Sequence, residues 1–584
     1  MAVLADPDGL DDEVDERQPY AHKYKAADAL LQAMEGSDDT LSRAMLNAKR
    51  GLLLLETDLL KDGEDCVQAA LPVLSSHVGR ACPCANNKDP ASSTASQDQA
   101  CSEQETGTLC KLQQDCYNSL AVLWCSRGDH AAALSWLKKA EEVYKQHLGC
   151  NPATASNTST DIPRADTMQA IHMQSLEAGY TSTLFYLAQV HGHADNRDQS
   201  ARYCAATLQR QLAAGSFDVS EWLQNCVQLA NYYSSTHAFA LAEHCIAAAH
   251  CVQLRQQRVS HTGPPSGMEQ VAPEVEANLH MAAAKLAMAR LAASHAAYIA
   301  GQLPLDLPYP DPSHFPSLLC FPSLANDMPS LTALHWGVAA LAQDFATART
   351  IFNAGMVEYN MALAYYQLDG WVTEHVHTLM DVSNMFRLLA AFESEPHRQA
   401  AMHKQRVQRL QPVSGSALNK EHYLGLVRSI ELELGAAWRD VMDAVAQGKD
   451  SKQSSKAALA AATHYTAYLD SYKHSATASL PARIDEDNEV IFLTASFNLG
   501  RVMHRCSLGN NTPQRELDIM VGAVRHLQWV VEYVAKYDIT QFRDEARLSK
   551  ELSDLLLEKI KMLQRVMAVQ TQDASARTSH ARSI

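Results

Sequence analysis

The chain has 584 residues, of which 47% are hydrophobic and 20% charged, an ordinary composition for a folded protein. The formal net charge of −17 argues against nonspecific nucleic-acid binding, which needs a basic face to neutralise phosphates. Abundant Ala, Leu and Gln, with few runs of Val or Ile, favour helix over strand. A chain of this length predicts several domains or one long repeat array.

The N-terminal segment and the apolar runs bear on targeting. Residues 1–17 are acidic where a secretory signal needs a basic and then an apolar stretch, so we expect a disordered N-terminus without a signal. The longest apolar run, 280–301, contains Lys285 and Arg290, which predicts a buried helix and no membrane insertion. A reduced cysteine packs as a small hydrophobic side chain, and cysteines stay reduced in the cytosol. Cysteines at apolar helical positions therefore indicate a cytosolic protein. Several cysteines lie at apolar helical positions, as at Cys204, Cys226 and Cys245.

An internal repeat is most distinct at 116–144. A tetratricopeptide repeat places bulky, Leu-small and aromatic residues on its first helix (helix A), a Gly at the turn, and small, bulky and small residues on its second. Small residues let two helices approach closely, and large ones fill the space between layers. The segment meets every spacing with Tyr117, Leu120, Ala121, Trp124, Gly128, Ala133, Leu137 and Ala140.

The same pattern returns elsewhere along the chain. Residues 225–249 match it well, and 183–212 match it more weakly. Residues 497–506 contain its Leu-Gly pair and precede a helix predicted over about 514–537. Segment 48–74 resembles a degenerate copy. Generic antiparallel helices that match by chance are the alternative interpretation.

Segments that are poor in bulky residues or rich in proline divide these helices. We expect loops at 75–105, 149–165 and 258–273, where small polar residues predominate. Seven prolines make 301–330 a linker, because such a density excludes helix. We therefore predict one helical half over 18–300 and a second over 331–568. Residues 569–584 are predicted to form a disordered tail.

The common catalytic motifs are missing from the sequence. It contains no P-loop, HExxH, GxSxG or dinucleotide-binding glycine pattern. The pair Cys82 and Cys84 lies in a predicted loop, and no second pair stands at zinc-ligand spacing. We therefore predict no catalytic residues, no cofactor and no metal.

Segment 369–393 combines acidic and histidine side chains and raises the possibility of a metal or acid–base site. Each helical residue turns by about 100°, so His377 and Asp381 share a face whereas His375 lies about 200° from His377. The two histidines therefore cannot bind one ion from a regular helix. A surface or capping role is the favoured interpretation, with Thr373 or Asp369 as the cap and Glu374 at the positive helix end.

Helix A of each repeat would line the concave face of an array. The residues predicted to face this groove are polar but uncharged, apart from one valine. The basic clamp with which some arrays hold a peptide carboxylate is missing, so a broader protein surface is favoured as the partner. The residues are Asn118, Val122, Gln189, Gln224 and Asn231.

Two blocks of the sequence, 185–212 and 367–412, resemble the most distinctive blocks of the KIF-binding protein family, the kinesin-binding proteins. The first has the runs LAQV, AxYC and TLxRQL at 187–190, 201–204 and 207–212. The second has DGxVTxH, AxFE and MHKxR at 369–375, 390–393 and 402–406. Weaker matches in the same order occur at 18–31, 116–144, 221–222 and 497–502.

The resemblance implies an all-α fold, a right-handed tetratricopeptide-like α-solenoid of antiparallel helix pairs in two halves. It also implies a noncatalytic, cytoplasmic and cytoskeleton-associated protein that captures kinesin motor domains and blocks their attachment to microtubules. We expect a monomer. An acidic chain suits this role, because the microtubule-binding face of a motor is basic. The segments 75–99 and 301–330 have no counterpart in the family pattern, so the set of kinesins bound could differ.

The resemblance also suggests partner-binding residues in each half. In the first half, Tyr186, Gln189 and Gln211 match the family block, while Gln228 and Asn231 lie on the next helix without an identical match. For Tyr186, packing between helices is the alternative interpretation. The candidates of the second half are Thr373, His375 and Asp381.

Two other functions stay open on the sequence alone. One is a general tetratricopeptide scaffold or adaptor that holds an extended peptide of another partner in its groove. The other is an enzyme that uses the histidine-rich segment 369–393, which would require His377 for an activity.

Overall fold

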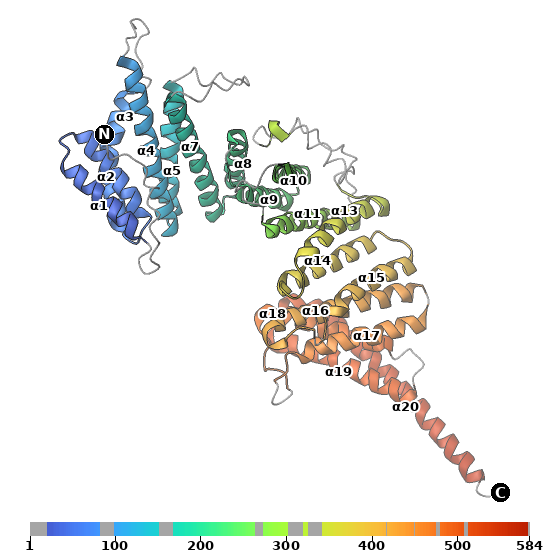
Figure 1. Cartoon of the computed structure of the whole chain (residues 1–584). Helices are drawn as coiled ribbons and strands as arrows, with labels where there is room; N and C mark the ends of the chain where they lie inside the picture. Colours follow the sequence, from blue (N-terminus) through green and yellow to red (C-terminus); the bar gives the residue numbers. More distant parts are fainter. Residues whose placement is uncertain are drawn as a thin grey trace. The chain divides into compact units, whose positions relative to one another are not determined.

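The computed structural model describes residues 20–81, 98–150, 168–215, 217–262, 272–301, 319, 321–324, 341–415, 417–448, 450–474, 479–506 and 512–581. These residues form eighteen α-helices and three short 3-10 helices, and within these ranges there is no strand (Figure 1). The predicted all-α fold is confirmed. Most helices pack against the next one in the chain, as in an α-solenoid of helix pairs.

The chain divides into two compact units. The first comprises residues up to Tyr232 together with a short segment around the 3-10 helix η5 (Pro322–Leu324). Its helices from α1 to α8 pack serially, and α7 contacts both α4 and α5. They are α1 (Ala21–Glu35), α2 (Thr40–Leu55), α3 (Leu60–Ala81), α4 (Asp98–Ser126), α5 (His130–Cys150), α7 (Met168–His193), α8 (Arg197–Ala214) and α9 (Val219–Ser235).

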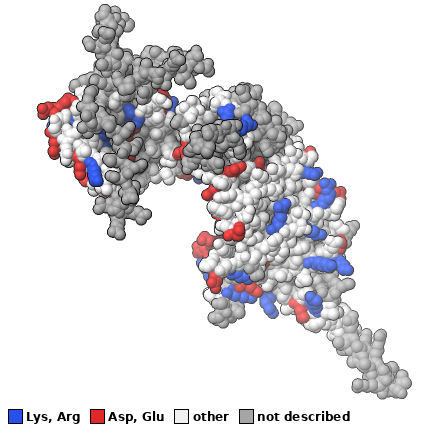
Figure 2. All heavy atoms as spheres, in the orientation of Figure 1, with Lys and Arg blue, Asp and Glu red and all other residues white. Residues whose placement is uncertain are grey.

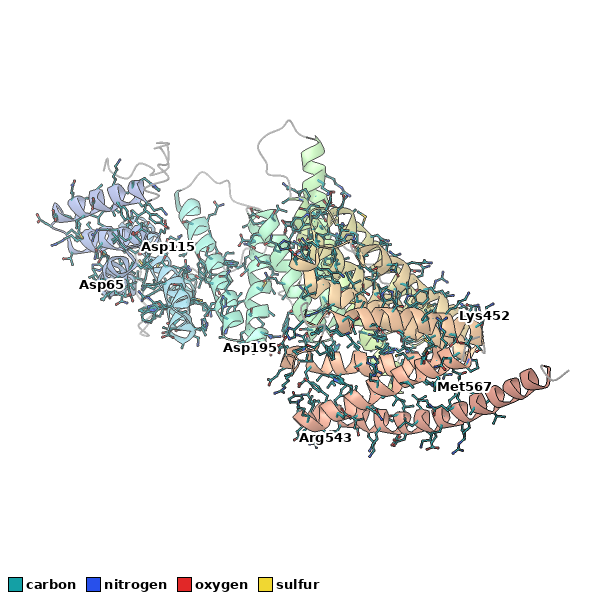
Figure 3. The ribbon with its side chains drawn as sticks, turned by 90° about the horizontal axis from the view of Figure 1, so that it is seen from below. Asp65, Asp115, Asp195, Lys452, Arg543 and Met567 are labelled. Atoms are coloured by element: carbon teal, nitrogen blue, oxygen red, sulfur yellow. The ribbon has the colours of Figure 1, made fainter. Side chains whose placement is uncertain are left out.

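The second unit begins at Tyr233 and includes the rest of the described chain. Figure 3 labels the start of its last helix at Arg543, and Met567 farther along it. The 3-10 helices η6 (Gln411–Val413) and η7 (Thr540–Phe542) precede α16 and α20. The α-helices are α10 (Phe239–Thr262), α11 (Pro273–Ile299), α13 (Phe345–Tyr365), α14 (Val372–Ala390), α15 (Pro396–Leu410), α16 (Lys420–Gln447), α17 (Ser451–Asp470), α18 (Glu486–Cys506), α19 (Pro513–Tyr537) and α20 (Arg543–Ala581).

The predicted repeat positions lie in the core. In the 116–144 repeat, Leu120, Ala121, Ala133, Leu137 and Ala140 are fully buried between α4 and α5. The Leu-small pairs of the other two repeats are buried as well, and so is Leu499 of α18. Helix α19 coincides with the helix predicted over 514–537. The small-large pattern therefore predicted the α4–α5 and α7–α8 helix pairs correctly.

The turns that join the helices of the three repeats share one backbone conformation. Gly128, Asp195 and His237 have φ angles of +80°, +54° and +60°, and each lies four residues after the last bulky position of helix A. The next residue donates its backbone N–H to the carbonyl of that bulky residue, at 2.8–3.1 Å, as in a helix C-terminal cap. Asp195 is labelled at the α7–α8 turn in Figure 3. The shared turn is independent support for the weak third repeat.

Helices α2 and α3 cross at two glycines. A Cβ atom on Gly51 would lie 2.9 Å from the carbonyl oxygen of Gly63, and one on Gly63 would lie 2.8 Å from the backbone nitrogen of Leu55. Backbone atoms cannot move aside as a flexible side chain can, so these two positions set the distance between the helices. The degenerate repeat predicted at 48–74 is therefore a closely packed helix pair.

The division between the units is not the one that we predicted. We expected the halves to meet at 301–330, but the boundary lies between Tyr232 and Tyr233, inside the second repeat. The reason is packing: α11 lies against α13, which places residues 239–299 with the second unit.

Some predicted loop and tail limits are also wrong. Helix α3 extends to Ala81 because Val78 is buried and Ser75 accepts a hydrogen bond from Gln113 of α4, and α4 begins at Asp98. Helix α20 extends through the expected tail to Ala581, in a segment without Gly or Pro. The predicted N-terminal segment 1–17 and most of 301–330 lie outside the described residues.

Candidate partner-binding surfaces

The outward side of α4, α7 and α9 in the first unit forms the surface predicted from the repeats, called here the helix-A face. Val122 is 45% exposed, and the amide side chains of α7 and α9 are exposed as well. The prediction for Asn118 is wrong: it is buried, and it accepts a hydrogen bond from Thr183 at 3.0 Å. It therefore joins α4 to α7. The exposed amides are Gln189, Gln224, Gln228 and Asn231.

Tyr186 lies half-buried on α7, beside this face. Its ring packs on the cluster around Leu187 and lies 5.7 Å from the ring of Phe185, so part of it serves helix packing. Burial raises the pKa of Tyr186, and the nearby carboxylates of Asp115 and Glu221 raise it further. Asp115, labelled in Figure 3, comes from α4, and Glu221 comes from α9. Asp115 is paired with Lys111 of the same helix, so among the described residues Glu221 is the uncompensated one of these two acidic groups.

Glu221 is held outward by the residue that follows it. Trp222 is fully buried and donates its indole N–H to the carbonyl of Leu208 at 3.1 Å, which attaches α9 to α8. Glu221 is exposed on the same turn. Trp222 therefore packs in the core and holds α9 against α8, while Glu221 places a negative charge on the surface.

Gln211 is less accessible than the other candidates of the first unit. It is half-buried on α8, and its Oε1 atom is enclosed, with no hydrogen-bond donor among the described residues. The neighbouring Arg210 forms an ion pair with Glu177 and lies over the ring of Tyr180 at 4.8 Å. The matched run at 207–212 therefore mainly joins α8 to α7.

The histidine-rich segment forms helix α14, but its start differs from the predicted cap. The N-cap residue is Trp371, and neither Thr373 nor Asp369 caps the helix with its side chain. His375 is half-buried, and its Nδ1 lies 2.8 Å from the carbonyl oxygen of Tyr366. Because a carbonyl only accepts, Nδ1 carries the proton and donates it. His375 therefore fastens the helix start to the preceding turn and is a poor contact residue.

Thr373, His377 and Asp381 lie along one side of α14, spaced by four residues, as the sequence predicted for the last two. Thr373 and His377 are exposed. Asp381 is partly buried, and burial raises its pKa, although Lys285, a hydrogen bond from Tyr359 and the charge of His377 act in the opposite direction. Thr373 is the accessible candidate in this unit, and Asp381 is tied to its neighbours.

Two further residues of the matched second block have structural roles that the sequence did not reveal. Glu393 is buried, forms an ion pair with Arg398 at 3.0 Å and accepts the backbone N–H of Glu395. Arg406 is fully buried, and its guanidinium pairs with Glu433 at 2.7 Å and with Asp440 at 2.6 Å. Charged residues ordinarily indicate surface, so only their tertiary partners reveal this network.

Side chains able to hold a metal gather at one place in the described part of the chain. A single group there brings at least three suitable donors together, His250, His280 and Glu358, and it includes no residue of segment 369–393. Cys82 and Cys84 lie outside the described residues. Cys226 and Cys245 are buried and Cys204 is half-buried, as their apolar positions predicted.

The surface of the second unit has charges of both signs. Figure 2 shows Lys and Arg interspersed with Asp and Glu over its visible face. Among the helices described, none is both long and apolar enough to cross a membrane.

The helix pairs and the polar surface of helix A define the chain as a helical-repeat scaffold. Residues 220–563, more than half of the chain, match the family model described as KIF-1 binding protein C terminal. The chain belongs to the KIF-binding protein family, and the resemblance found in the sequence is confirmed.

Relatives match over almost the whole length. A KIF-binding protein of Gallus gallus is 26% identical over 93% of this chain and 92% of its own. That of Homo sapiens is 26% identical over 95% of both chains. A solved structure described as "Cryo-EM map of KIFBP" covers 95% of this chain and 97% of its own, with a TM-score of 0.58 and 18% identity. This last likeness establishes a shared fold.

Proposed function

We propose that this chain is a noncatalytic regulator that captures kinesin motor domains and blocks their attachment to microtubules. The observation that supports this most is the helix-A face, where the exposed amides of α7 and α9 lie with the exposed carboxylate of Glu221. The microtubule-binding surface of a motor is basic, so an acidic and amide-rich face is complementary to it. The relatives from Gallus gallus and Homo sapiens are named for binding KIF proteins.

The proposed contact is a broad surface. Interfaces between proteins bury large areas, in which a few aromatic residues supply most of the affinity and the surrounding polar groups supply specificity. Tyr186 has the first role, and Gln189, Gln228 and Asn231 have the second. In the second unit, Thr373 is the proposed contact residue, with Asp381 beside it. The chain would act as a monomer in the cytoplasm, at the cytoskeleton.

The test uses the full chain and recombinant kinesin motor domains from the same organism in a microtubule co-sedimentation assay. The unmodified chain should shift susceptible motors from the pellet to the supernatant. The double variant Gln189→Arg and Gln228→Arg places two cations on the helix-A face and should weaken motor binding about tenfold or more. Gln32→Arg, at an exposed position of α1, is the matched control and should bind as the unmodified chain does.

Each other outcome has a distinct meaning. Motors that bind the double variant fully would place the contact away from the helix-A face, and Thr373→Arg then tests the second unit. Motors that bind the chain and still sediment with microtubules would contradict the blocking role. If no motor binds, the proposal fails, and a scaffold for an extended peptide becomes the better description.

A further inference from the structure

Three helices of the second unit bring two imidazoles and a carboxylate together. His250 lies on α10, His280 on α11 and Glu358 on α13. One donor atom from each residue lies within 4.8 Å of the other two. The Nδ1 atom of His280 is 2.7 Å from Oε2 of Glu358, and the rings of His250 and His280 are 5.6 Å apart. Neither the helix-A face nor the side of α14 includes these residues.

We propose that His250, His280 and Glu358 form a binding site for a divalent transition-metal ion of the zinc class. Two histidines and one carboxylate are a donor set that zinc uses, with a fourth position left for water. Donor atoms around a tetrahedral zinc lie about 3.3 Å apart, given metal–ligand bonds of about 2.0–2.2 Å. Small rotations of the three side chains would bring the observed donors to that spacing. This site is separate from the proposed binding of motors.

The surroundings favour a bound cation. The side chain of Glu358 is 8% exposed and that of His280 is 15% exposed, so the carboxylate is mostly withdrawn from water. A buried carboxylate is costly unless a positive group compensates it. The Nδ1 atom of His280, 2.7 Å from the carboxylate, supplies part of that compensation, and a metal ion would supply more.

The position of the site gives the metal a structural effect. Helix α11 packs against both α10 and α13, and the three ligands come one from each of these helices. A metal bound there would link three successive helices by coordinate bonds. Any ligand that binds the folded state and not the unfolded state stabilises it. We therefore expect the metal to raise the midpoint of thermal unfolding.

The chain contains a matched control for this geometry. His464 and Glu431 form the same pair in α17 and α16, with Nδ1 and Oε2 also 2.7 Å apart and side chains 13% and 10% exposed. In the part of the chain that the structure describes, this pair is not part of a group of three donors. A simple His–Glu pair and a metal site can therefore be distinguished within one molecule.

The experiment uses the full chain after removal of metals with a chelator. Zinc chloride and cobalt chloride are titrated separately, and binding is followed by calorimetry, by metal analysis after gel filtration and by thermal unfolding. We expect one tightly bound metal ion per chain and a higher unfolding midpoint. The visible absorption of bound Co²⁺ should indicate tetrahedral nitrogen and oxygen ligands, without the near-ultraviolet band of a cobalt–thiolate bond.

Substitutions of the ligands distinguish the proposed site from metal bound elsewhere on the chain. His280→Gln and His250→Gln should each weaken metal binding at least tenfold, consistent with the loss of one ligand, while His464→Gln should not change it. His250 is half-buried, so its replacement leaves the fold testable if His280→Gln proves unstable. No binding by the unmodified chain, binding retained by both ligand variants, or a cobalt–thiolate band would overturn the proposal.

Discussion

The guanidinium of Arg406 lies fully buried beside α14 and α16 and has four polar neighbours. Besides Glu433 and Asp440, it contacts Ser383 and His403, each at 3.1 Å. Removing one partner of a buried ionic network leaves the other charges uncompensated, which costs about 3–5 kcal/mol. Because the two carboxylates keep some exposure, we expect Arg406→Met to lower the free energy of unfolding by about 3 kcal/mol.

Urea denaturation followed by circular dichroism measures this effect. Arg387→Met is the control, because Arg387 is exposed on α14 and donates its hydrogen bonds to Asn384, one turn before it on the same helix. It should change the free energy of unfolding by less than about 0.5 kcal/mol. Equal effects of the two substitutions would show that the buried network adds little to stability.

His403 gives the same network a pH dependence. Burial, together with the charge of Arg406, lowers the pKa of His403 to about 4, although the charge of Asp440 opposes this shift. Arg406 donates a hydrogen bond to Nδ1 of His403, which requires that this nitrogen be unprotonated. Since the unfolded chain takes up this proton near pH 6.5 and the folded chain near pH 4, the stabilisation is present above pH 6.5 and is lost as pH falls towards 4.

The measurement is the free energy of unfolding at pH 7 and at pH 4.5 for the unmodified chain and for His403→Gln. We expect the decrease between these pH values to be smaller in the variant, by about 2 kcal/mol. The variant is needed because other histidines titrate in the same range: burial also lowers the pKa of His504 and His526. An unchanged pH dependence would contradict the assignment to His403.

At the residue scale, sequence reasoning succeeded for exposed amides and failed for buried polar groups. Gln189, Gln224 and Asn231 are exposed as predicted, because their distance from the Leu-small pair defines their side of the helix. Asn118 obeys the same spacing and is nevertheless buried, because Thr183 of a helix distant in sequence supplies its hydrogen bond. Such partners are set by tertiary contacts, which spacing along one helix does not contain.

At the scale of elements, the crossing of α2 and α3 depends on glycine. Gly51→Ala would place a methyl group 2.9 Å from the Gly63 carbonyl oxygen and 2.7 Å from Val67. The helices must then separate, and we expect a loss of about 2 kcal/mol in the free energy of unfolding. Gly425→Ala in α16 is the opposite control, because Gly425 is exposed and no described residue lies within 4 Å of its added carbon, and it should gain about 0.5–1 kcal/mol.

Thermal and urea unfolding of these two variants measures whether the free energy of unfolding falls in the first and rises in the second. A stabilising Gly51→Ala would show that α2 and α3 can separate without loss of packing. A destabilising Gly425→Ala would show that the space around that residue is occupied in solution.

The turn shared by the three repeats was predictable from the sequence at one of its three positions. Gly128 was expected at a turn because glycine adopts positive φ without steric cost. Asp195 and His237 have the same conformation, which residues other than glycine adopt uncommonly. Asp and His adopt it more often than most residues do, so their identity was a much weaker signal than that of Gly128. The helices on either side of these turns were predicted from their small-large pattern. The positive φ angle belongs to the hydrogen-bonded cap that ends the first helix of each pair.

At the scale of the whole molecule, the division into units was the part that the sequence did not predict. Proline density predicts a break in helix, as at 301–330, but it contains no information on which helices pack together. The contact of α11 with α13 spans that segment and joins residues that the sequence separates. Family membership, in contrast, was predictable because two distinctive blocks occur in the right order.

The charge of −17 makes the proposed capture of motors sensitive to salt. Opposite charges accelerate association, and this gain is lost as ions screen them. We expect the association rate constant with a motor domain to fall about tenfold when ionic strength rises from about 0.05 M to 0.5 M. Stopped-flow mixing measures it.

A matched pair of substitutions localises this effect. Glu221→Gln on the helix-A face should flatten the salt dependence, whereas Glu35→Gln at an exposed position of α1 should not. If both substitutions flatten it equally, steering comes from the overall charge and not from the helix-A face.

The serial packing of the helices has a mechanical consequence. Since most helices contact mainly their neighbours in the chain, tension applied to the two ends of a unit would be opposed by one helix interface at a time. Helices would then detach successively from the ends, and the extension would increase in small steps at low force. A partner that pulls on such a chain would extend it at low force. The helices that remain packed would keep their surfaces intact.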